Sequence, residues 1–221
     1  MIELLSQYDV LGAFWANIQL TFFSAIGALL VGTILAVMRV SPSPALRWAG
    51  ATYVNTVRNT PLTLIILGCW LVLWGKLGVE LSSNLDNNSF WMAVIGLSAY
   101  TAAFVCESLR AGFNTVPTGQ AEAARSLGFG FGQTMSLVVL PQAFRGAIAP
   151  LGNTLIALTK NSTVAAAAAV PQAATEMQKM IEFSPDLGFA IFMVIALGFV
   201  VIVFPMGVLF THLSQRLAVA R

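Results

Sequence analysis

The sequence predicts an all-α fold, a single polytopic bundle of about five membrane-spanning helices. Of its 221 residues, 57% are hydrophobic and only 9% are charged, whereas a soluble domain carries about 25% charged residues. The mean hydropathy of +0.82 agrees with a membrane protein. A chain of this length is expected to form one domain, residues 1–221, whose solvent is the lipid bilayer. The net charge of +2 is small and scattered, which excludes a nucleic-acid partner.

Five stretches are long and apolar enough to be membrane helices, which need about 20 mainly apolar residues. The region 160–186 is different, because the apolar, small-residue stretch STVAAAAAVPQAA is followed by the polar stretch TEMQKMIEFSPD. We expect there a helix packed against protein at membrane depth and then an exterior loop, with a sixth full span as the alternative. The five predicted spans are approximately 14–38, 55–77, 90–110, 134–159 and 187–212.

Charged residues between the spans predict the orientation, because positive residues favour the cytoplasmic side. All arginines fall toward one face: Arg39, Arg47, Arg58, Arg110, Arg125, Arg145, Arg216 and Arg221. Three lysines and most acids fall toward the other: Lys76, Lys160, Lys179, Glu3, Asp9, Glu80, Asp86, Glu176, Glu182 and Asp186. Five spans then place the N-terminus outside and the C-terminus in the cytoplasm.

One polar insert, GQAEAARSLGFGFGQTMSLVVLPQ at 119–142, separates two apolar runs on the predicted cytoplasmic side. Its QAEAARSL segment has high helix propensity, and Gly128 is a plausible C-terminal stop. Glu122 and Arg125 are three residues apart and therefore share one helix face. The small side chains of this helix let another protein approach its surface closely. The alternative is that the segment is only an amphipathic connector. These small residues are Ala121, Ala123 and Ala124.

The spacing of this insert resembles the EAA loop of permeases of ATP-binding-cassette (ABC) importers. That loop has E-A-A, three residues, G, nine residues, an aliphatic residue, one residue and L-P. Here these positions are Glu122-Ala123-Ala124, Gly128, Val138 and Leu140-Pro141. The predicted loop extends over 117–133, and its core is 119–132.

Three further segments resemble permeases for polar amino acids: TVRNTPLTL (56–64), AYTAAFVCESLRAGFNTVPTGQAEAARSLG (99–128) and LPQAFRGAIAPLGNTLIALTKNST (140–163). Asn59 stands where that family usually has glycine. VRNTPLTL and PLGNTLIALTKN are nearest to the glutamate/glutamine permeases of actinobacteria. The resemblance implies a type I ABC-importer transmembrane fold and a bacterial plasma-membrane location.

The resemblance also implies the partners of the chain. The loop helix would seat in a cleft of a cytoplasmic ATPase dimer, and loss of Glu122 would uncouple ATP hydrolysis from uptake. A second permease subunit, a different chain, would complete the membrane domain, and an extracytoplasmic binding protein would deliver an amino acid, glutamate or glutamine. The implied ATPase contacts are Glu122, Ala123, Ala124, Arg125 and Gly128.

The chain itself is not expected to be an enzyme or to bind a cofactor, because it contains no G-x-x-x-x-G-K-[ST] phosphate loop. ATP and magnesium would bind the separate ATPase. His212 is the only histidine, and Cys69 and Cys106 lie in apolar runs, so we expect no metal site and two free, buried thiols. The main alternative is a self-sufficient secondary transporter or channel, a class that often shows internal repeats; none is visible here.

Polar residues inside spans are costly and usually face a bundle interior or water. Glu107 and Arg110 are expected to pair, with a structural or a pathway-facing role. Arg58 precedes Pro61, which predicts either a simple bend or a gate. Lys160 is a candidate for binding a substrate carboxylate, with snorkelling to the interface as the alternative. The full set of candidate pathway or gate residues is Arg58, Glu107, Arg110, Asn153, Lys160 and Asn161.

Overall fold

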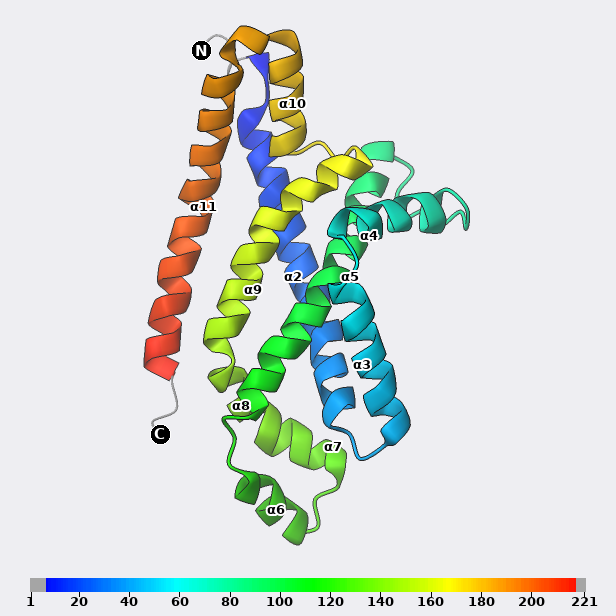
Figure 1. Cartoon of the computed structure of the whole chain (residues 1–221), viewed down its shortest axis with the longest axis vertical. Coiled ribbons are helices and arrows are strands. Elements are labelled where there is room, and N and C mark those ends of the chain that lie inside the picture. The colour runs from blue at the N-terminus through cyan, green and yellow to red at the C-terminus, as the bar shows by residue number, and fades with distance from the viewer. Residues whose placement is uncertain (1–6, 218–221) are drawn as a thin grey trace.

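The computed structural model describes residues 7–217, and within this range every regular element is a helix. Three helices are long and apolar enough to cross a membrane. Glu3 and Arg221, which enter the charge-based orientation, lie outside the described residues. The three long helices are α2 (Val10–Val40), α5 (Leu85–Phe113) and α11 (Gly188–Leu217), and they run along the long axis of the molecule (Figure 1).

The second predicted span, 55–77, is not one continuous helix. The chain forms α3 (Pro44–Arg58), turns by 107°, and continues as α4 (Leu62–Gly68) and the π-helix η1 (Cys69–Trp74). Pro61 explains the turn, because it lacks the N–H that would continue the helix and disfavours helical geometry in the residue before it. The hydropathy of the sequence identified only the apolar second half of this broken helix pair as a membrane span.

The fourth predicted span, 134–159, is also broken, with a bend of 67° at Ala147. Pro150 accounts for the break, because its ring would clash with the carbonyl of residue 146 in a continuous helix. If each bent pair crosses the membrane once, the chain has up to five crossings. The elements of this pair are α7 (Phe131–Gln133), π-helix η2 (Thr134–Val139), α8 (Leu140–Gly146), α9 (Ile148–Asn161) and 3-10 helix η3 (Ser162–Ala168).

The region 160–186 differs from the prediction in one respect, because its polar part is a helix rather than a loop. This helix, α10 (Ala173–Phe183), is followed by the short 3-10 helix η4 (Pro185–Leu187). α10 contacts both α2 and α11 and buries Met180 completely. The apolar segment η3 packs against α2, α4 and α5, as expected for a segment held against protein.

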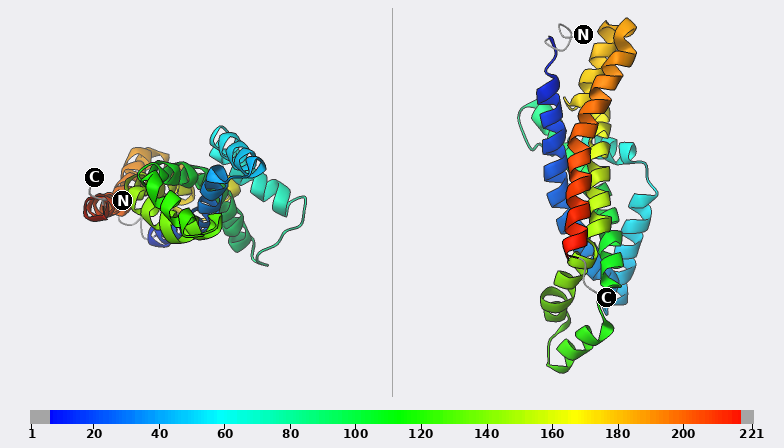
Figure 2. Two further views of the ribbon diagram at one scale, coloured as in Figure 1. Left: turned by 90° about the horizontal axis from the view of Figure 1, so that it is seen from below. Right: turned by 90° about the vertical axis from the view of Figure 1, so that its left-hand side faces the viewer.

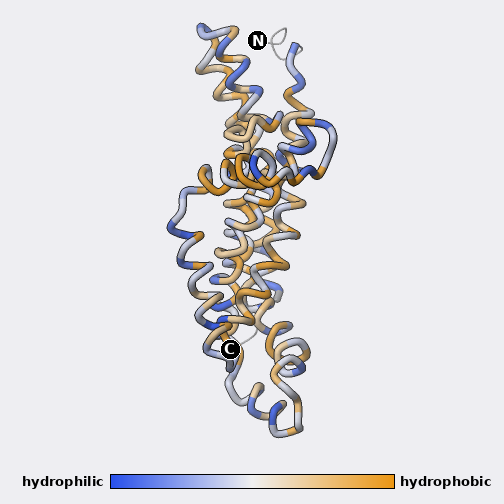
Figure 3. The backbone as a smooth tube through the Cα atoms, turned by 90° about the vertical axis from the view of Figure 1, so that its right-hand side faces the viewer, coloured by the Kyte–Doolittle hydropathy of each residue, from blue (hydrophilic) through white to orange (hydrophobic). Residues whose placement is uncertain are grey.

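Helix α5 is the centre of the bundle, since it contacts α2, α3, α4, α8 and α9. Its contact with α2 is very close: a Cβ atom added to Gly32 would lie 2.6 Å from Val105. Helix α6 (Thr118–Ser126) lies beyond the bundle at one end, and α10 with the start of α11 forms the other end (Figure 2). Hydrophilic residues gather near both ends (Figure 3).

A buried amide on α2 holds the connection between α9 and α10. Asn17, only 1% exposed, donates from Nδ2 to the Ser162 hydroxyl at 2.8 Å and accepts the Ala173 N–H at 2.9 Å. The Gln172 side chain then caps α10 by accepting the Ala174 N–H. These bonds satisfy polar groups that would be expensive to leave unpaired at such depth.

Candidate functional site

Helix α6 is a short, exposed helix that follows α5 after residues 114–117. Glu122, Ala123 and Arg125 are exposed, whereas Ala124 is only 5% exposed and α6 contacts η2. Four of the five predicted ATPase contacts, including Gly128, are therefore on the surface, and Ala124 supports α6 from within the chain. In the described range neither Glu122 nor Arg125 forms a salt bridge, so both charges can meet a partner.

The C-terminal end of α6 is capped, because carbonyls of its last turn accept backbone hydrogen bonds. Gly128 has φ +89°, and its N–H donates to the Arg125 carbonyl at 3.0 Å. The Phe129 N–H donates to the Ala124 carbonyl at 3.1 Å, which completes a Schellman motif. The predicted helix stop at Gly128 is thus confirmed.

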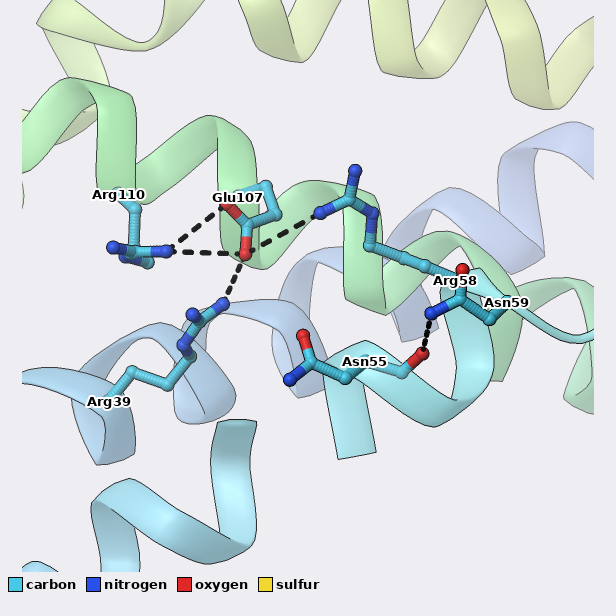
Figure 4. A network of polar contacts seen from close by, with 6 residues as sticks. All are labelled: Arg39, Asn55, Arg58, Asn59, Glu107 and Arg110. Carbon is cyan, nitrogen blue, oxygen red and sulfur yellow. Dashed lines mark hydrogen bonds and ion pairs between the residues drawn. The ribbon is translucent and has the colours of Figure 1, made fainter. Parts of the chain in front are cut away.

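A second polar site centres on Glu107 of α5, which faces three arginines (Figure 4). Arg110 lies one turn further along α5, with Nη1 at 3.3 Å from Glu107 Oε2, which confirms the predicted pair. Arg39, in the last turn of α2, donates a hydrogen bond to Glu107 Oε1. Arg58, the last residue of α3, has Nη1 at 3.8 Å from the same oxygen.

Sequence reasoning missed Arg39 as a member of this cluster. It used Arg39 only to orient the chain, because Glu107 is 68 residues away. One signal was present: Glu107 is a lone carboxylate at the arginine-rich ends of the predicted spans. A partly buried carboxylate near several arginines is expected to pair with more of them than its neighbour in the sequence.

A groove of about 350 Å³ lies between α5 and α9, next to the Glu107 cluster. Tyr100, Thr101 and Phe104 line it from α5, and Asn153 and Asn161 line it from α9. The ring of Phe104 connects the two sites, since the Arg58 guanidinium carbon lies over it at 5.7 Å from the ring centroid.

The structure therefore separates the six candidate pathway residues into two neighbouring groups and one outlier. The groups are Glu107 with its predicted partner Arg110 and the candidate Arg58, which was not expected to join them, and the two asparagines of the groove. Lys160 is exposed and does not line the groove. Thr101, which the sequence did not single out, contributes a buried hydroxyl that has no hydrogen-bond partner within the described part of the chain.

The two cysteines are free thiols: Cys106 is fully buried and Cys69 is half-buried. Across residues 7–217, no group of three or more His, Cys, Asp or Glu side chains is placed to hold a metal ion.

The bent helix pairs, the groove and the exposed end helix define the membrane-embedded subunit of a transporter. The chain belongs to the family of binding-protein-dependent transport system inner membrane components, whose model matches residues 28–219. It is thus a multi-pass membrane permease, and the resemblance of its loop to that of ABC-importer permeases reflects true membership.

Two relatives cover nearly the whole chain. The chain is 52% identical over 218 residues to the glutamate transport system permease protein GluC of Corynebacterium glutamicum, covering 96% of each chain. It is 32% identical over 204 residues to the probable glutamine ABC transporter permease protein GlnM of Bacillus subtilis, covering 92% of this chain and 91% of the relative.

Solved structures agree on the fold. An amino acid ABC transporter crystallised with histidines matches with a TM-score of 0.78 and 25% identity, over 94% of this chain and 93% of that one. The inward-facing methionine transporter MetNI matches with a TM-score of 0.74 and 20% identity, over 95% of this chain and 96% of that one. The predicted type I ABC-importer transmembrane fold is confirmed.

Proposed function

We propose that this permease forms half of the translocation pathway of an ATP-driven importer of acidic or amidated amino acids, with glutamate as the substrate. The names of its relatives support this substrate, since the relative at 52% identity is a glutamate permease and one at 32% is a probable glutamine permease. The groove supports a pathway role, because it presents the amides of Asn153 and Asn161 at the interface of α5 and α9.

The observation that carries the coupling mechanism is the direct connection of α6 to α5. α5 is one continuous helix from Leu85 to Phe113, and α6 begins at Thr118. Thr101 lies about 18 Å from the end of α5 at 1.5 Å per residue. A displacement of α6 by a separate ATPase would therefore be transmitted to the groove wall through the four-residue connection 114–117 and through the packing of α6 on η2.

The proposed assembly contains two copies of the ATPase, which hold ATP and magnesium, and a second, different permease subunit. An extracytoplasmic binding protein delivers the amino acid to the end of the bundle that carries α10. In this arrangement α6 and the C-terminus are cytoplasmic and the N-terminus is outside, as the arginine distribution predicts. Glu122 is the proposed charged contact with the ATPase, and the exposed Ala123 lets the two surfaces approach closely.

The experiment compares Glu122→Ala with the unaltered complex in proteoliposomes, measuring uptake of labelled glutamate and ATP hydrolysis stimulated by the binding protein. We expect the variant to lose uptake and the stimulation of hydrolysis by the binding protein while the ATPase keeps its basal hydrolysis, because truncating one partner of a desolvated charge pair leaves the other unpaired. Glu80→Ala, an exposed glutamate in the loop before α5, is the matched control and should leave both intact.

Two results would contradict the proposal. One is normal coupling in the Glu122 variant. The other is uptake that survives ATP depletion and collapses with the ion gradient, which would favour a secondary transporter.

A further inference from the structure

Two cavities meet at the first residues of α2, at the end of the molecule that carries α10 (Figure 1). The larger one, about 690 Å³, is a groove between the start of α2 and the first half of α11, and its lining is mainly apolar. The smaller one, about 310 Å³, lies between α2 and the start of α10 and contains the carboxylates of Asp9 and Glu176. Asp9 lines both cavities, so a charged pocket adjoins the end of an apolar groove.

Phe14 keeps α2 and α11 apart along this α2–α11 groove. Its ring meets the ring of Phe199 edge to face, with the ring centroids 5.3 Å apart. A Cβ atom added to Gly198 would lie 2.2 Å from Phe14, so the two helices already touch here. The space beside this contact stays open, and its rim is exposed: Leu11 of α2 is 84% exposed and Val201 of α11 is 72% exposed.

The material around the α2–α11 groove is the hydrocarbon of the bilayer, because both helices are long and apolar enough to cross a membrane. An apolar cavity does not hold water, and an empty one deprives the atoms of its lining of van der Waals contacts. A lipid acyl chain is the apolar material that a bilayer supplies. The groove alone would not select one lipid, since an acyl chain is in equally apolar surroundings elsewhere in the bilayer.

Selection between lipids comes from the charges at the end of the groove. Asp9 accepts the Gly12 N–H with Oδ1 at 2.9 Å and forms no salt bridge with any residue of the described range. Glu176, 14% exposed, pairs at 2.7 Å with Lys179, which is half exposed. An ammonium group has three N–H donors and can therefore bond both carboxylates. A phosphate next to that ammonium would find a positive charge in Lys179.

We propose that a phospholipid with a primary ammonium head group, such as phosphatidylethanolamine, binds at this place. One acyl chain lies in the α2–α11 groove, and the ammonium lies between Asp9 and Glu176. Phosphatidylglycerol is disfavoured, because it carries a negative charge and no ammonium to offer the two carboxylates. The site is independent of the transported solute. The assignment of the lipid to the outer leaflet rests on the proposed orientation, which puts the start of α2 outside.

A membrane helix of another subunit is the competing occupant of an exposed apolar groove. The charges favour the lipid, because an apolar helix brings no ammonium to the pocket that adjoins the groove. The experiment below separates these two occupants.

The experiment uses the complete complex of both permease subunits and the ATPase, purified in detergent with equal amounts of phosphatidylethanolamine and phosphatidylglycerol. Native mass spectrometry then counts the molecules of each lipid that stay bound. The unaltered complex should retain phosphatidylethanolamine preferentially. Asp9→Asn should lower the ratio of the two lipids about tenfold, the usual effect of losing one charge-assisted contact. Asparagine is a good N-cap residue, so this change removes the charge and keeps the cap of α2.

Asp86→Asn is the matched control for the charge, because Asp86 is an exposed acid in the first turn of α5 and lines neither cavity. It should leave the ratio unchanged. Thermal unfolding of each complex checks assembly, and lipid retention is compared only among assembled complexes.

A second pair of variants tests the α2–α11 groove. Val201→Trp fills the groove and should lower the retained phosphatidylethanolamine at least about tenfold, because the acyl chain loses its place. Val200→Trp is the matched control, since Val200 is the exposed neighbour on α11 and does not line the groove. It should retain as much lipid as the unaltered complex.

Photocrosslinking identifies the occupant in cell membranes. With the photoreactive amino acid benzoylphenylalanine in place of Leu11, illumination should attach a phospholipid to this chain, and Val201→Trp should abolish that product.

Three results would overturn the proposal. The first is an unchanged lipid ratio in Asp9→Asn. The second is equal lipid retention by Val201→Trp and Val200→Trp, which would show that the retained lipid is only non-specific boundary lipid. The third is a crosslink from position 11 to another protein subunit instead of a lipid. Failure of the unaltered complex and its binding protein to import glutamate would contradict the proposed function alone, because none of these lipid measurements depends on transport.

Discussion

Glu107 on α5 accepts a hydrogen bond from Arg39 in the last turn of α2, across 68 residues of sequence. Through this carboxylate the ends of α2 and α3 meet α5 at one point, directly before the sharp turn that follows Arg58. The cluster therefore holds the α3–α4 turn in place relative to the helix that leads to α6. The contacts that stabilise the cluster are therefore also the contacts that fix the position of the α3–α4 turn.

Replacing Glu107 with glutamine should destabilise the assembled protein by about 2 kcal/mol or more, because three guanidiniums lose their common counter-charge. Thermal unfolding of the purified complex measures the loss. Glu80→Gln is the control, since Glu80 is exposed and forms no salt bridge within the described residues, and such surface changes usually alter stability by about 0.5 kcal/mol or less. Equal effects of the two changes would contradict the importance of the cluster.

Gly112→Ala should disrupt the packing of α5 on α8. A Cβ atom at Gly112 would lie 2.2 Å from the carbonyl oxygen of Ala143, a backbone atom that cannot move aside cheaply. We expect a loss of about 1–3 kcal/mol in unfolding free energy, the usual cost of overpacking. The control is Gly207→Ala on α11, where a Cβ atom meets nothing within 4 Å. That change should be neutral or stabilise by up to about 1 kcal/mol, and a comparable loss there would argue against this explanation.

Gly128→Ala should weaken coupling without unfolding the bundle. The φ of +89° at Gly128 costs a residue with a side chain about 1–2 kcal/mol, so the end of α6 would fray. The measurement is ATP hydrolysis stimulated by the binding protein, beside thermal unfolding of the complex. Gly119→Ala, in the same loop with open space around it, is the control. Full stimulation in the Gly128 variant would show that the capped end is dispensable.

Cysteine labelling tests the predicted orientation. With Cys69 and Cys106 replaced by alanine, Ala123→Cys should react with a membrane-impermeant thiol reagent only from the cytoplasmic side. Gln178→Cys, on the exposed face of α10, should react only from outside. Both positions are exposed in this chain, and labelling is done on the permease expressed without the ATPase, which would otherwise cover α6. Reaction of Ala123→Cys in intact cells would invert the topology and remove α6 from any cytoplasmic ATPase.

The sequence predicted the straight helices well, because α2, α5 and α11 each contain enough apolar residues in one run to mark a span. It also predicted α6 and its end at Gly128, since both depend on local propensity. The turn after Arg58 was foreseen only as a bend at Pro61, and α3 was missed because its composition is mixed rather than apolar. The break at Ala147 has a local cause in Pro150, but the prediction took the apolar run around it as one helix.

Contacts between distant segments were the least predictable part of the site. The Glu107–Arg110 pair was found because the residues are one helical turn apart. Arg39 was not, because only the packing of α2 on α5 brings it there. The polar stretch 175–186 was expected as a loop, yet most of it is helical within α10, because Gln172 caps this helix and Met180 packs inward.

The amide of Asn17 is satisfied by groups that lie far along the chain and are therefore synthesised much later. α2 is the first long helix to leave the ribosome, whereas the groups that satisfy Asn17 follow 145 and 156 residues later. Until residue 173 has been synthesised, the Asn17 amide of α2 lacks one of its hydrogen-bond partners, which is unfavourable in apolar surroundings. The first long helix therefore depends on a hydrogen bond from α10, which lies near the end of the chain. A chain truncated before α10 would lack this hydrogen bond to Asn17.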